Sequence, residues 1–418
     1  MEQVPGKHKV SKSASEDIIS TMPEDVITRI LDRLPIQYAV RTSVLSRNWR
    51  FNWTLLSQVI FDEFFFDYLE GIGGENWYDE NNISKILLHL KGSITKFHLY
   101  IPEGKVLDVT ELDHWVLLLS RKGIKEFILR NRHEEPCMLS SNLFSCVKLE
   151  RLSLSNCSLY PAPTFCGFPY LCEVTFVNLN FGEIITQCPL LEFLEVVYFV
   201  ADPIGKIKMV EIAKLKNLKC LFFPLCMLDT TSLTSSLVFH LVGHFSKLQK
   251  LSLDLRKCKF IRESGAGNWV RTSLSCLGTL TLYSVDFDSE VMLSFAIEMI
   301  WGLPELQTLK IKAAYNAPVP QPALCASVFK NISMGQLQLR VIDFYPFRGS
   351  DNELWLIKNL LACSPLLKKF YIFPIRMFFC SRNEKLMFAT KLSKLHRASS
   401  AAKVKIMIPN VNITGSWY

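Results

Sequence analysis

The chain lacks a long uncharged apolar stretch. No run of 18 or more apolar residues is free of charge and proline, so no membrane span is expected. Residues 1–15 are polar and have no apolar centre, so they show no secretory signal and should form a loose tail. Hydrophobic residues make up 49% of the chain and charged residues 21%, which excludes a disordered protein.

A Cys-x-x-Cys pair is also missing. The 13 cysteines are an odd number and are scattered along the chain. This usage is typical of a reducing compartment, where buried thiols stay free, and not of a disulfide framework. We therefore expect the protein in the cytoplasm and/or the nucleus.

No set of residues typical of an enzyme is present. His240 and His244 have the spacing of a zinc-binding helix, but HLVGH lacks the Glu beside the first His that a metalloprotease needs. The glycines after Gly71 lack the later Gly and the Lys of a phosphate loop. No Gly-x-Ser-x-Gly elbow occurs, and the cysteines do not stand in basic, exposed contexts that would lower a thiol pKa. We expect no catalysis, no metal and no cofactor.

What the chain does contain is a dense set of helix signals between Glu16 and Trp53. Thr21 and Glu24 have the spacing of a capping box, with negative charge in the first turn, and Pro35 ends the helix. A second short helix is expected over 37–42. Apolar residues of the first helix fall on one wide arc: Val26, Ile27, Ile30, Leu31 and Leu34. A third helix is expected from a narrow stripe: Leu45, Trp49, Trp53 and Leu56.

This segment should leave apolar surface for a partner, because a unit so short rarely buries enough to be stable alone. The wide arc of the first helix has room for both its own bundle and a partner. The narrow stripe that includes Trp49 suits the internal core better. The alternative is an ordinary three-helix subdomain docked on the rest of the chain.

From Ile94 onward the chain repeats one phrase, apolar-x-x-apolar-x-apolar, which is typical of the strand of a leucine-rich repeat. In a strand the two closely spaced apolar residues enter the core and the residue between them faces out. We predict one parallel strand per repeat, from about Ile94 to Ile372, in a curved α/β solenoid. Helical spacing is found between phrases at Asp113–Ser120 and Asn352–Cys363. The eleven phrases start at Ile94, Ile124, Leu149, Leu171, Leu191, Leu218, Leu248, Leu277, Leu306, Leu339 and Leu367.

The outward residues of these phrases should form a recognition column on the concave face: His98, Ile128, Ser153, Thr175, Glu195, Phe222, Ser252, Thr281, Lys310, Asp343 and Tyr371. The column is chemically mixed, whereas a nucleic-acid surface would show a basic stripe with interleaved aromatics. We therefore interpret it as a protein-binding face, parts of which are alternatively solvated scaffold or covered by loops. Its candidate target-binding residues are His98, Thr175, Glu195, Phe222, Lys310, Asp343 and Tyr371.

The net charge of +8 is unevenly placed. Residues 358–418 carry 11 Lys or Arg against one acid, Glu384, which gives +10 and leaves −2 for residues 1–357. A basic C-terminus can bind nucleic acid or acidic surfaces. Because these charges stand in an apolar and aromatic context and not in a run, we interpret them as a solvated face.

The order of residues from Met22 to Trp53, MPEDVITRILDRLPIQYAVRTSVLSRNWRFNW, resembles the F-box of plant F-box proteins. Met22 stands where Leu is usual and Arg47-Asn-Trp where Lys-Arg-Trp is usual, and both changes keep the chemistry. The resemblance, over about 45 residues, implies binding to the adaptor of an SCF ubiquitin ligase. It carries the adaptor-binding role onto Met22, Pro23, Ile27, Leu31, Leu34, Val40, Leu45 and Trp49.

The C-terminal part resembles the FBD domain that follows leucine-rich repeats in many plant F-box proteins. The resemblance lies in RVIDFYPFRGSDNEL from Arg340, LLACSPLLKKF from Leu360 and RASSAAKVKI from Arg397. It implies no activity, and we expect a cap on the exposed edge of the solenoid. The expected organisation is a tail (1–15), an F-box (16–62), a linker and entry to the solenoid (63–93), leucine-rich repeats (94–333), an FBD-like cap (334–408) and a tail (409–418).

Together these features predict a non-catalytic substrate-recognition subunit of an SCF-type E3 ubiquitin ligase. Its partners would be the SCF adaptor, through it a cullin, and an unknown target protein held close to the ubiquitin-transfer machinery. Neither nucleic acid nor a membrane is an expected partner. The alternatives are a binding scaffold that acts outside a ligase and a nucleic-acid-associated protein that uses the basic C-terminus.

Overall fold

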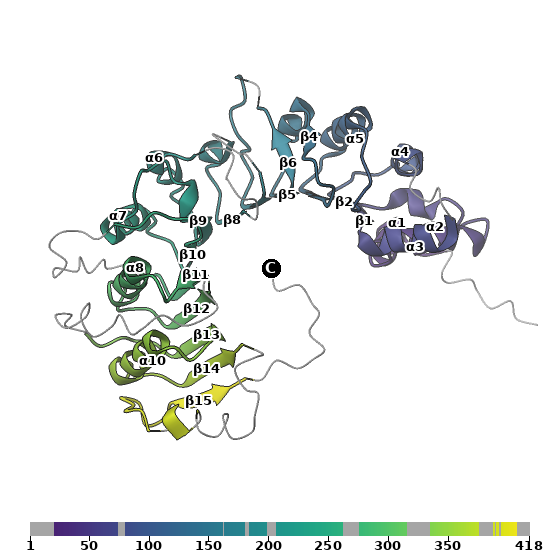
Figure 1. Ribbon diagram of the computed structural model, residues 1–418. Helices are drawn as coiled ribbons and strands as arrows, with labels where there is room; N and C mark the ends of the chain where they lie inside the picture. Colours follow the sequence, from purple (N-terminus) through teal and green to yellow (C-terminus); the bar gives the residue numbers. More distant parts are fainter. Residues whose placement is uncertain are drawn as a thin grey trace, which may run out of the picture.

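The computed structural model describes residues 21–73, 80–161, 163–179, 184–198, 206–261, 276–315, 335–375, 388, 390–392 and 394–407. These residues form an arc in which strands line the inner side and most helices lie on the outer side (Figure 1). The inner strands make one 13-stranded parallel sheet. The predicted α/β solenoid behind an N-terminal helical segment is confirmed.

The strands of the large sheet follow one another in chain order, so each repeat pairs with the next. All eleven predicted phrases are strands of this sheet, and the sheet extends them by one strand at each end, β1 and β15. Two further strands, β4 (Cys137–Leu139) and β6 (Cys157–Leu159), form a small second sheet. The large sheet contains β1 (Gln58–Phe61), β2 (Lys96–Ile101), β3 (Glu126–Asn131), β5 (Arg151–Ser155), β7 (Glu173–Val177), β8 (Phe193–Val197), β9 (Cys220–Pro224), β10 (Lys250–Asp254), β11 (Thr279–Asp286), β12 (Thr308–Ala314), β13 (Val341–Phe347), β14 (Lys369–Pro374) and β15 (Lys403–Ile406).

The length of each repeat decides whether a helix fits on the outer side. In the 20 residues from Leu171 to Leu191, the described part of the connection holds a 3₁₀ turn, while the 30 residues from Ile94 to Ile124 hold a helix of 14 residues. The helices predicted over Asp113–Ser120 and Asn352–Cys363 are confirmed as α5 and α10. The outer elements are α4 (Glu80–His89), α5 (Val109–Lys122), η4 (Ser141–Ser145), η5 (Ile184–Gln187), α6 (Met209–Ile212), η6 (Leu225–Met227), α7 (Ser235–Gly243), α8 (Glu290–Trp301) and α10 (Asp351–Cys363).

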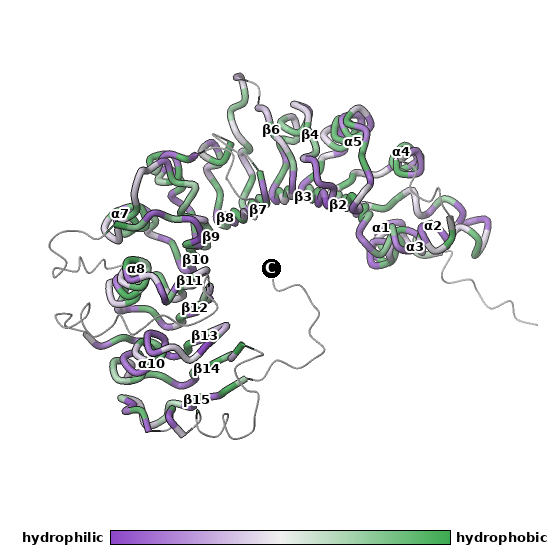
Figure 2. The backbone as a smooth tube through the Cα atoms, in the orientation of Figure 1, coloured by the Kyte–Doolittle hydropathy of each residue, from purple (hydrophilic) through white to green (hydrophobic). Residues whose placement is uncertain are grey.

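The core is a set of apolar ladders between this sheet and the outer elements. Leu251 of β10 lies in register with Leu221 of β9 and Leu280 of β11, and all three are buried. The colouring of Figure 2 shows hydrophobic residues recurring in strand after strand along the inner curve. Because alternate strand residues point to opposite faces, each ladder turns its apolar side away from the concave surface.

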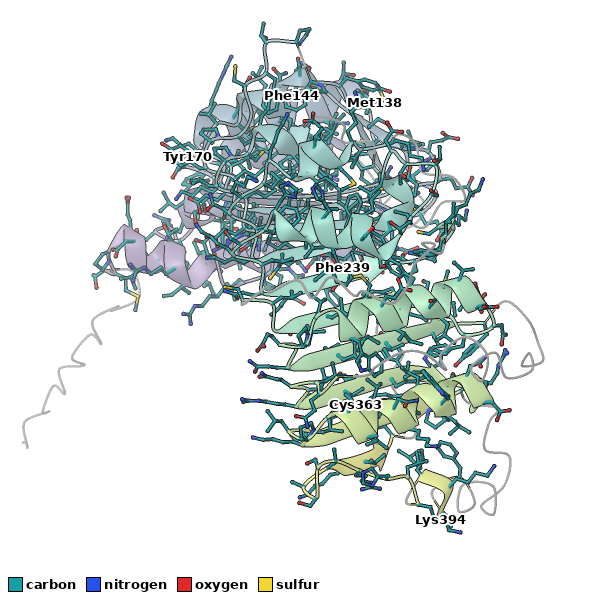
Figure 3. All side chains as sticks on the ribbon, turned by 90° about the vertical axis from the view of Figure 1, so that its left-hand side faces the viewer. Met138, Phe144, Tyr170, Phe239, Cys363 and Lys394 are labelled. Carbon is teal, nitrogen blue, oxygen red and sulfur yellow. The ribbon has the colours of Figure 1, made fainter. Side chains whose placement is uncertain are left out.

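On the outer side, neighbouring helices approach closely. A side chain at Gly302, the residue after α8, would lie 2.3 Å from the ring of Phe239 on α7, so only glycine fits without a shift of that ring. Figure 3 looks at this side and shows Phe239 above α8 and α10, which lie in front of the strands and run nearly along them. The connection between repeats is thus tight on the outside as well as in the sheet.

The N-terminal segment differs from the expectation in two details. It contains α1 (Glu24–Leu31), α2 (Ile36–Arg41), η1 (Thr42–Val44) and η2 (Asn52–Leu55). The capping box is wrong: Pro23 is the N-cap of α1, and no side chain caps the helix. Because Pro23 is extended and its carbonyl accepts hydrogen bonds from the amides of Val26 and Ile27, the helix starts two residues later than a Thr21 cap would place it.

The third helix is also wrong in type. The amides of Asn52, Thr54 and Leu56 each bond to the carbonyl three residues earlier, which is 3₁₀ geometry with three residues per turn. Asn and aromatic residues are weaker helix formers than Leu or Ala, and this segment is rich in both. Apolar residues spaced about four apart therefore do not stay on one face of the segment: Trp49 is buried, but Leu45 is 67% exposed.

The segment from 63 to 93, expected as a linker, contains two helices, α3 (Glu63–Gly73) and α4. Phe65 of α3 packs its ring 5.0 Å from that of Phe61 and 5.2 Å from that of Phe66. These buried aromatics cover the start of the sheet, where β1 and β2 pair. The dense aromatic stretch was the signal for this packing.

The first strand is tied to the helical segment by one carboxylate. Asp32, at the end of α1, accepts hydrogen bonds from the Ser57 amide (2.9 Å), the Ser57 hydroxyl (2.6 Å) and the Gln58 amide (3.2 Å). These bonds occupy backbone donors at the entry to β1. The helical segment is therefore fastened to the sheet.

At the other end, β15 presents Lys403 and Lys405, both exposed, on the last strand. Lysines on an edge strand disfavour pairing with another chain.

Substitution should separate the two faces of a strand. Leu251→Ala should lower the free energy of unfolding by about 2–5 kcal/mol, because it leaves a cavity between two ladders. Glu195→Ala, Lys310→Ala and Asp343→Ala, on the opposite face, should each change it by less than about 0.5 kcal/mol. Urea unfolding followed by circular dichroism measures both. Similar losses in the two groups would show that the faces are exchanged.

Candidate functional sites: an exposed apolar set and a concave column

The N-terminal helices expose several large apolar side chains. On α1, Ile27 and Leu31 are buried, while Val26 and Ile30 on the adjoining edge are 36% and 39% exposed. The wide arc of α1 thus faces its own core with one edge and solvent with the other. We call these residues the exposed apolar set: Val26, Ile30, Leu34, Tyr38, Val44, Leu45 and Phe51.

The eight residues that carry the adaptor-binding prediction divide between core and surface. Ile27, Leu31 and Trp49 are buried, so in the free chain they support the surface and do not form it. The other five reach the surface wholly or in part: Met22, Pro23, Leu34, Val40 and Leu45.

Sequence reasoning did not assign Val26, Ile30, Tyr38, Val44 and Phe51 to the contact. For the first two, the signal was their place on the outer edge of the arc.

The recognition column is continuous across the sheet. Strand pairing places every predicted member beside the next, and the column gains Ile60 at one end and Lys405 at the other. The strands line the inner side of the arc (Figure 1), and the members face that side because they alternate with the buried core residues. Most are half-buried, Thr281 is buried and Lys310 is exposed.

Charges in the first strands compensate one another. The Glu126 carboxylate lies 2.7 Å from the Lys96 ammonium and 2.7 Å from the Arg151 guanidinium. These three residues stand on β2, β3 and β5, one pairing step apart and two residues before the column. Ion pairing lowers the pKa of Glu126 against the raising effect of its burial.

His98, in the same region, is held neutral. Burial, followed by the positive charges of Arg130 and Lys96, lowers its pKa to about 4, against the opposing effect of Asp62 and Glu126. Among the described residues its Nε2 has no hydrogen-bond partner. This nitrogen is itself buried.

Two carboxyls of the column have raised pKa values. Burial raises the pKa of Glu195, which accepts a hydrogen bond from Thr175 at 3.4 Å. Burial also raises the pKa of Asp343, although the Lys310 ammonium 3.9 Å away partly opposes it. Both carboxyls therefore gain from a hydrogen-bond donor brought by a partner.

One thiol departs from the expectation that no cysteine has a lowered pKa. A hydrogen bond from the Cys258 thiol, helped by Lys206 and Arg256, lowers the pKa of Cys226 to about 7. The prediction is wrong here because the hydrogen-bond donor Cys258 and the two basic residues are distant in sequence from Cys226. Elsewhere burial raises the thiol pKa, as at Cys137, Cys146 and Cys188.

Other chemistry is not assembled in the described part of the chain. There, no group of three or more His, Cys, Asp and Glu residues is placed to hold a metal ion. The rings of His240 and His244 meet edge to face, with centroids 4.9 Å apart, at the C-terminal end of α7. None of the described helices is long and apolar enough to cross a membrane.

Comparison with known proteins agrees with this architecture. Residues 19–57 match the F-box domain, and residues 112–240 match the leucine-rich repeats of the FBD-associated F-box protein At5g56370. The chain is thus similar to F-box proteins with leucine-rich repeats, and the resemblance seen in its sequence is confirmed.

Its relatives share most of its length. It is 29% identical to the F-box/FBD/LRR-repeat protein At1g13570 of Arabidopsis thaliana, over 85% of this chain and 90% of that one. It is 24% identical to an F-box/LRR-repeat protein of the same plant, At3g42770, over 94% of this chain and 80% of that one.

The neutral state of His98 predicts a pH dependence. An unfolded His has a pKa near 6.5. Between about pH 6.5 and pH 4, His98 is protonated in the unfolded chain but neutral in the folded chain. The free energy of unfolding should therefore fall as the pH drops below about 6.5. His98→Gln should lose less stability than wild type between pH 7 and pH 5 in urea unfolding. Equal losses would mean that His98 is protonated in the folded chain at pH 5.

The thiol pair predicts a selective reaction. Alkylation of Cys226 by iodoacetamide should rise with pH around a midpoint near 7. Cys258→Ala removes the hydrogen bond that stabilises the thiolate, so the midpoint should move to higher pH. Mass spectrometry of the Cys226 peptide gives the rate at each pH, and an unmoved midpoint would assign the effect to Lys206 and Arg256.

Proposed function

We propose that this protein is the substrate-recognition subunit of an SCF-type E3 ubiquitin ligase. The F-box would bind the SCF adaptor and, through it, a cullin, while the concave column binds a target protein for ubiquitination. The observation that carries this proposal is the exposed apolar set on a segment that matches the F-box domain. The chain itself would perform no catalytic step.

The apolar exposure supports a partner on energetic grounds. Each large side chain that a partner covers gains about 1.5–3 kcal/mol relative to full exposure, and these side chains are already partly covered. Several such residues on one short segment are typical of a protein contact, whereas single exposed apolar residues are ordinary. The buried Ile27, Leu31 and Trp49 hold that surface in shape.

The connection between the two surfaces supports a proximity role. Asp32 fastens the F-box to β1, and every later strand is paired with its predecessor. A target on the column would therefore be held at a set position relative to the adaptor. Such positioning raises the effective concentration of its lysines without activating them.

The remaining assignments belong to the same proposal. Residues 334–408 would be an FBD-like cap, supported by β13, β14 and β15 closing the C-terminal end of the sheet. The tails at 1–15 and 409–418 lie outside the described residues. The site of action would be the cytoplasm and/or the nucleus.

The adaptor contact is tested by paired variants. Ile30→Ala/Leu45→Ala removes two exposed apolar side chains and should weaken adaptor binding at least about tenfold, because truncation at the centre of an interface commonly costs over 1 kcal/mol per residue. Leu190→Ala/Leu366→Ala removes two equally exposed leucines from outer turns and should bind as wild type. Titration of purified adaptor gives both affinities, with circular dichroism to verify folding.

A second comparison separates a ligase subunit from a scaffold. Affinity purification under proteasome inhibition should recover adaptor and cullin with the full chain, and neither with a chain that lacks residues 16–56. Adaptor without cullin would favour a scaffold outside a ligase. Wild-type affinity in the Ile30/Leu45 variant would show that the F-box is not held through this surface.

A further inference from the structure

The two halves of the concave face differ in how their charges are compensated. In the first strands, Glu126 is shared by Lys96 and Arg151, and acid–base pairs also stand at strand entries. These entry pairs are Lys125 with Glu150 at 2.8 Å and Lys219 with Glu192 at 2.7 Å. A partner gains little by bringing charge here.

From β10 to β15 the inward positions are dominated by lysine. The acids at these positions are Asp254, Asp343 and, at the end of β11, Asp286, and the Asp254 carboxylate is buried and paired with Arg256 at 2.6 Å. Among the described residues, the one ion pair of these lysines is the 3.9 Å contact between Lys310 and Asp343. The inward lysines are Lys250, Lys310, Lys312, Lys369, Lys403 and Lys405.

Aromatic rings hold the centre of this half in place. The Lys312 ammonium lies 4.2 Å from the ring centroid of Tyr283 and 4.9 Å from that of Tyr345. The ring of Tyr283 meets Phe222 edge-on at 4.8 Å, and that of Tyr345 meets Phe373 at 6.0 Å. Burial and the nearby Lys310 lower the pKa of Lys312, so an added negative charge would favour its charged form.

We propose that the β10–β15 half of the concave face binds an extended acidic segment of the target protein, rich in Asp and Glu. This inference rests on the proposed function, since it names the chemistry that the target presents. Six lysines, of which only Lys310 forms an ion pair among the described residues, supply the complementary charge from β10, β12, β14 and β15. Six strands at about 4.8 Å spacing span about 24 Å, the length of about seven extended residues.

The same surface suits a peptide better than a nucleic acid. Nucleic-acid sites stack bases on free aromatic faces, but Lys312 lies over the faces of Tyr283 and Tyr345. Asp343 stands in the middle of the lysines and would repel a continuous phosphate backbone. A peptide can place a neutral donor at this point and acids around it.

Purified full chain with bound adaptor is titrated with a fluorescent twelve-residue peptide in which Asp and Glu alternate with Gly and Ser. Binding should be saturable and should weaken as salt is added. The matched peptide with Asn and Gln in place of the acids should bind at least about tenfold more weakly. A single-stranded oligonucleotide of equal charge that binds more tightly than the acidic peptide would overturn the proposal in favour of nucleic acid.

Matched variants locate the site. Lys250→Gln/Lys369→Gln/Lys405→Gln removes three inward lysines and should weaken acidic-peptide binding about tenfold. Lys216→Gln/Lys247→Gln/Lys358→Gln removes three exposed lysines that are not on the concave face and should leave it unchanged. Equal effects of the two variants, or none from the first, would overturn the proposal.

Adaptor affinity is measured on the same samples. Adaptor binding depends on the exposed apolar set. If the wild-type chain binds the adaptor but not the acidic peptide, the acidic-target inference is rejected and the ligase role stands. If the wild-type chain does not bind the adaptor, the ligase role is rejected.

Discussion

Parallel register between neighbouring strands is the constraint on which the rest of the structure depends. Each strand supplies two core residues and one outward residue at fixed positions, so pairing aligns the apolar ladders and the column in one step. A slip of one residue in any strand would exchange these roles. The core, the concave surface and the spacing of its charges therefore have one common cause.

Much of the fold could be predicted because the period of two is a local signal. All eleven phrases were found, since each carries its own apolar pattern whatever lies between. β1 was missed although Leu56, Val59 and Phe61 have the same spacing, because Leu56 was assigned to the expected third helix. The third helix failed for a related reason: apolar spacing near four does not distinguish an α-helix from 3₁₀ turns when the residues are weak helix formers.

The sites were less predictable because they depend on what neighbours cover. The apolar arc of α1 was predicted from the sequence. The sequence did not indicate that Ile27 would be buried and Ile30 exposed. The shared carboxylate of Glu126 joins residues 25 or more positions apart, and the Cys226–Cys258 pair joins residues 32 positions apart. The members of the recognition column, by contrast, could be predicted from the sequence, because each is the residue between the two closely spaced apolar residues of its phrase.

The hydrogen bonds of Asp32 fix the F-box to the first strand of the solenoid. The distance from the F-box to any position on the concave face is therefore set by the number of strands that separate that position from β1. Adding or removing one whole repeat would move every later strand by about 4.8 Å along the curve, while the surfaces at both ends of the solenoid stay intact. Change in repeat number could thus set which lysine of a bound protein is within reach, independently of how tightly that protein binds.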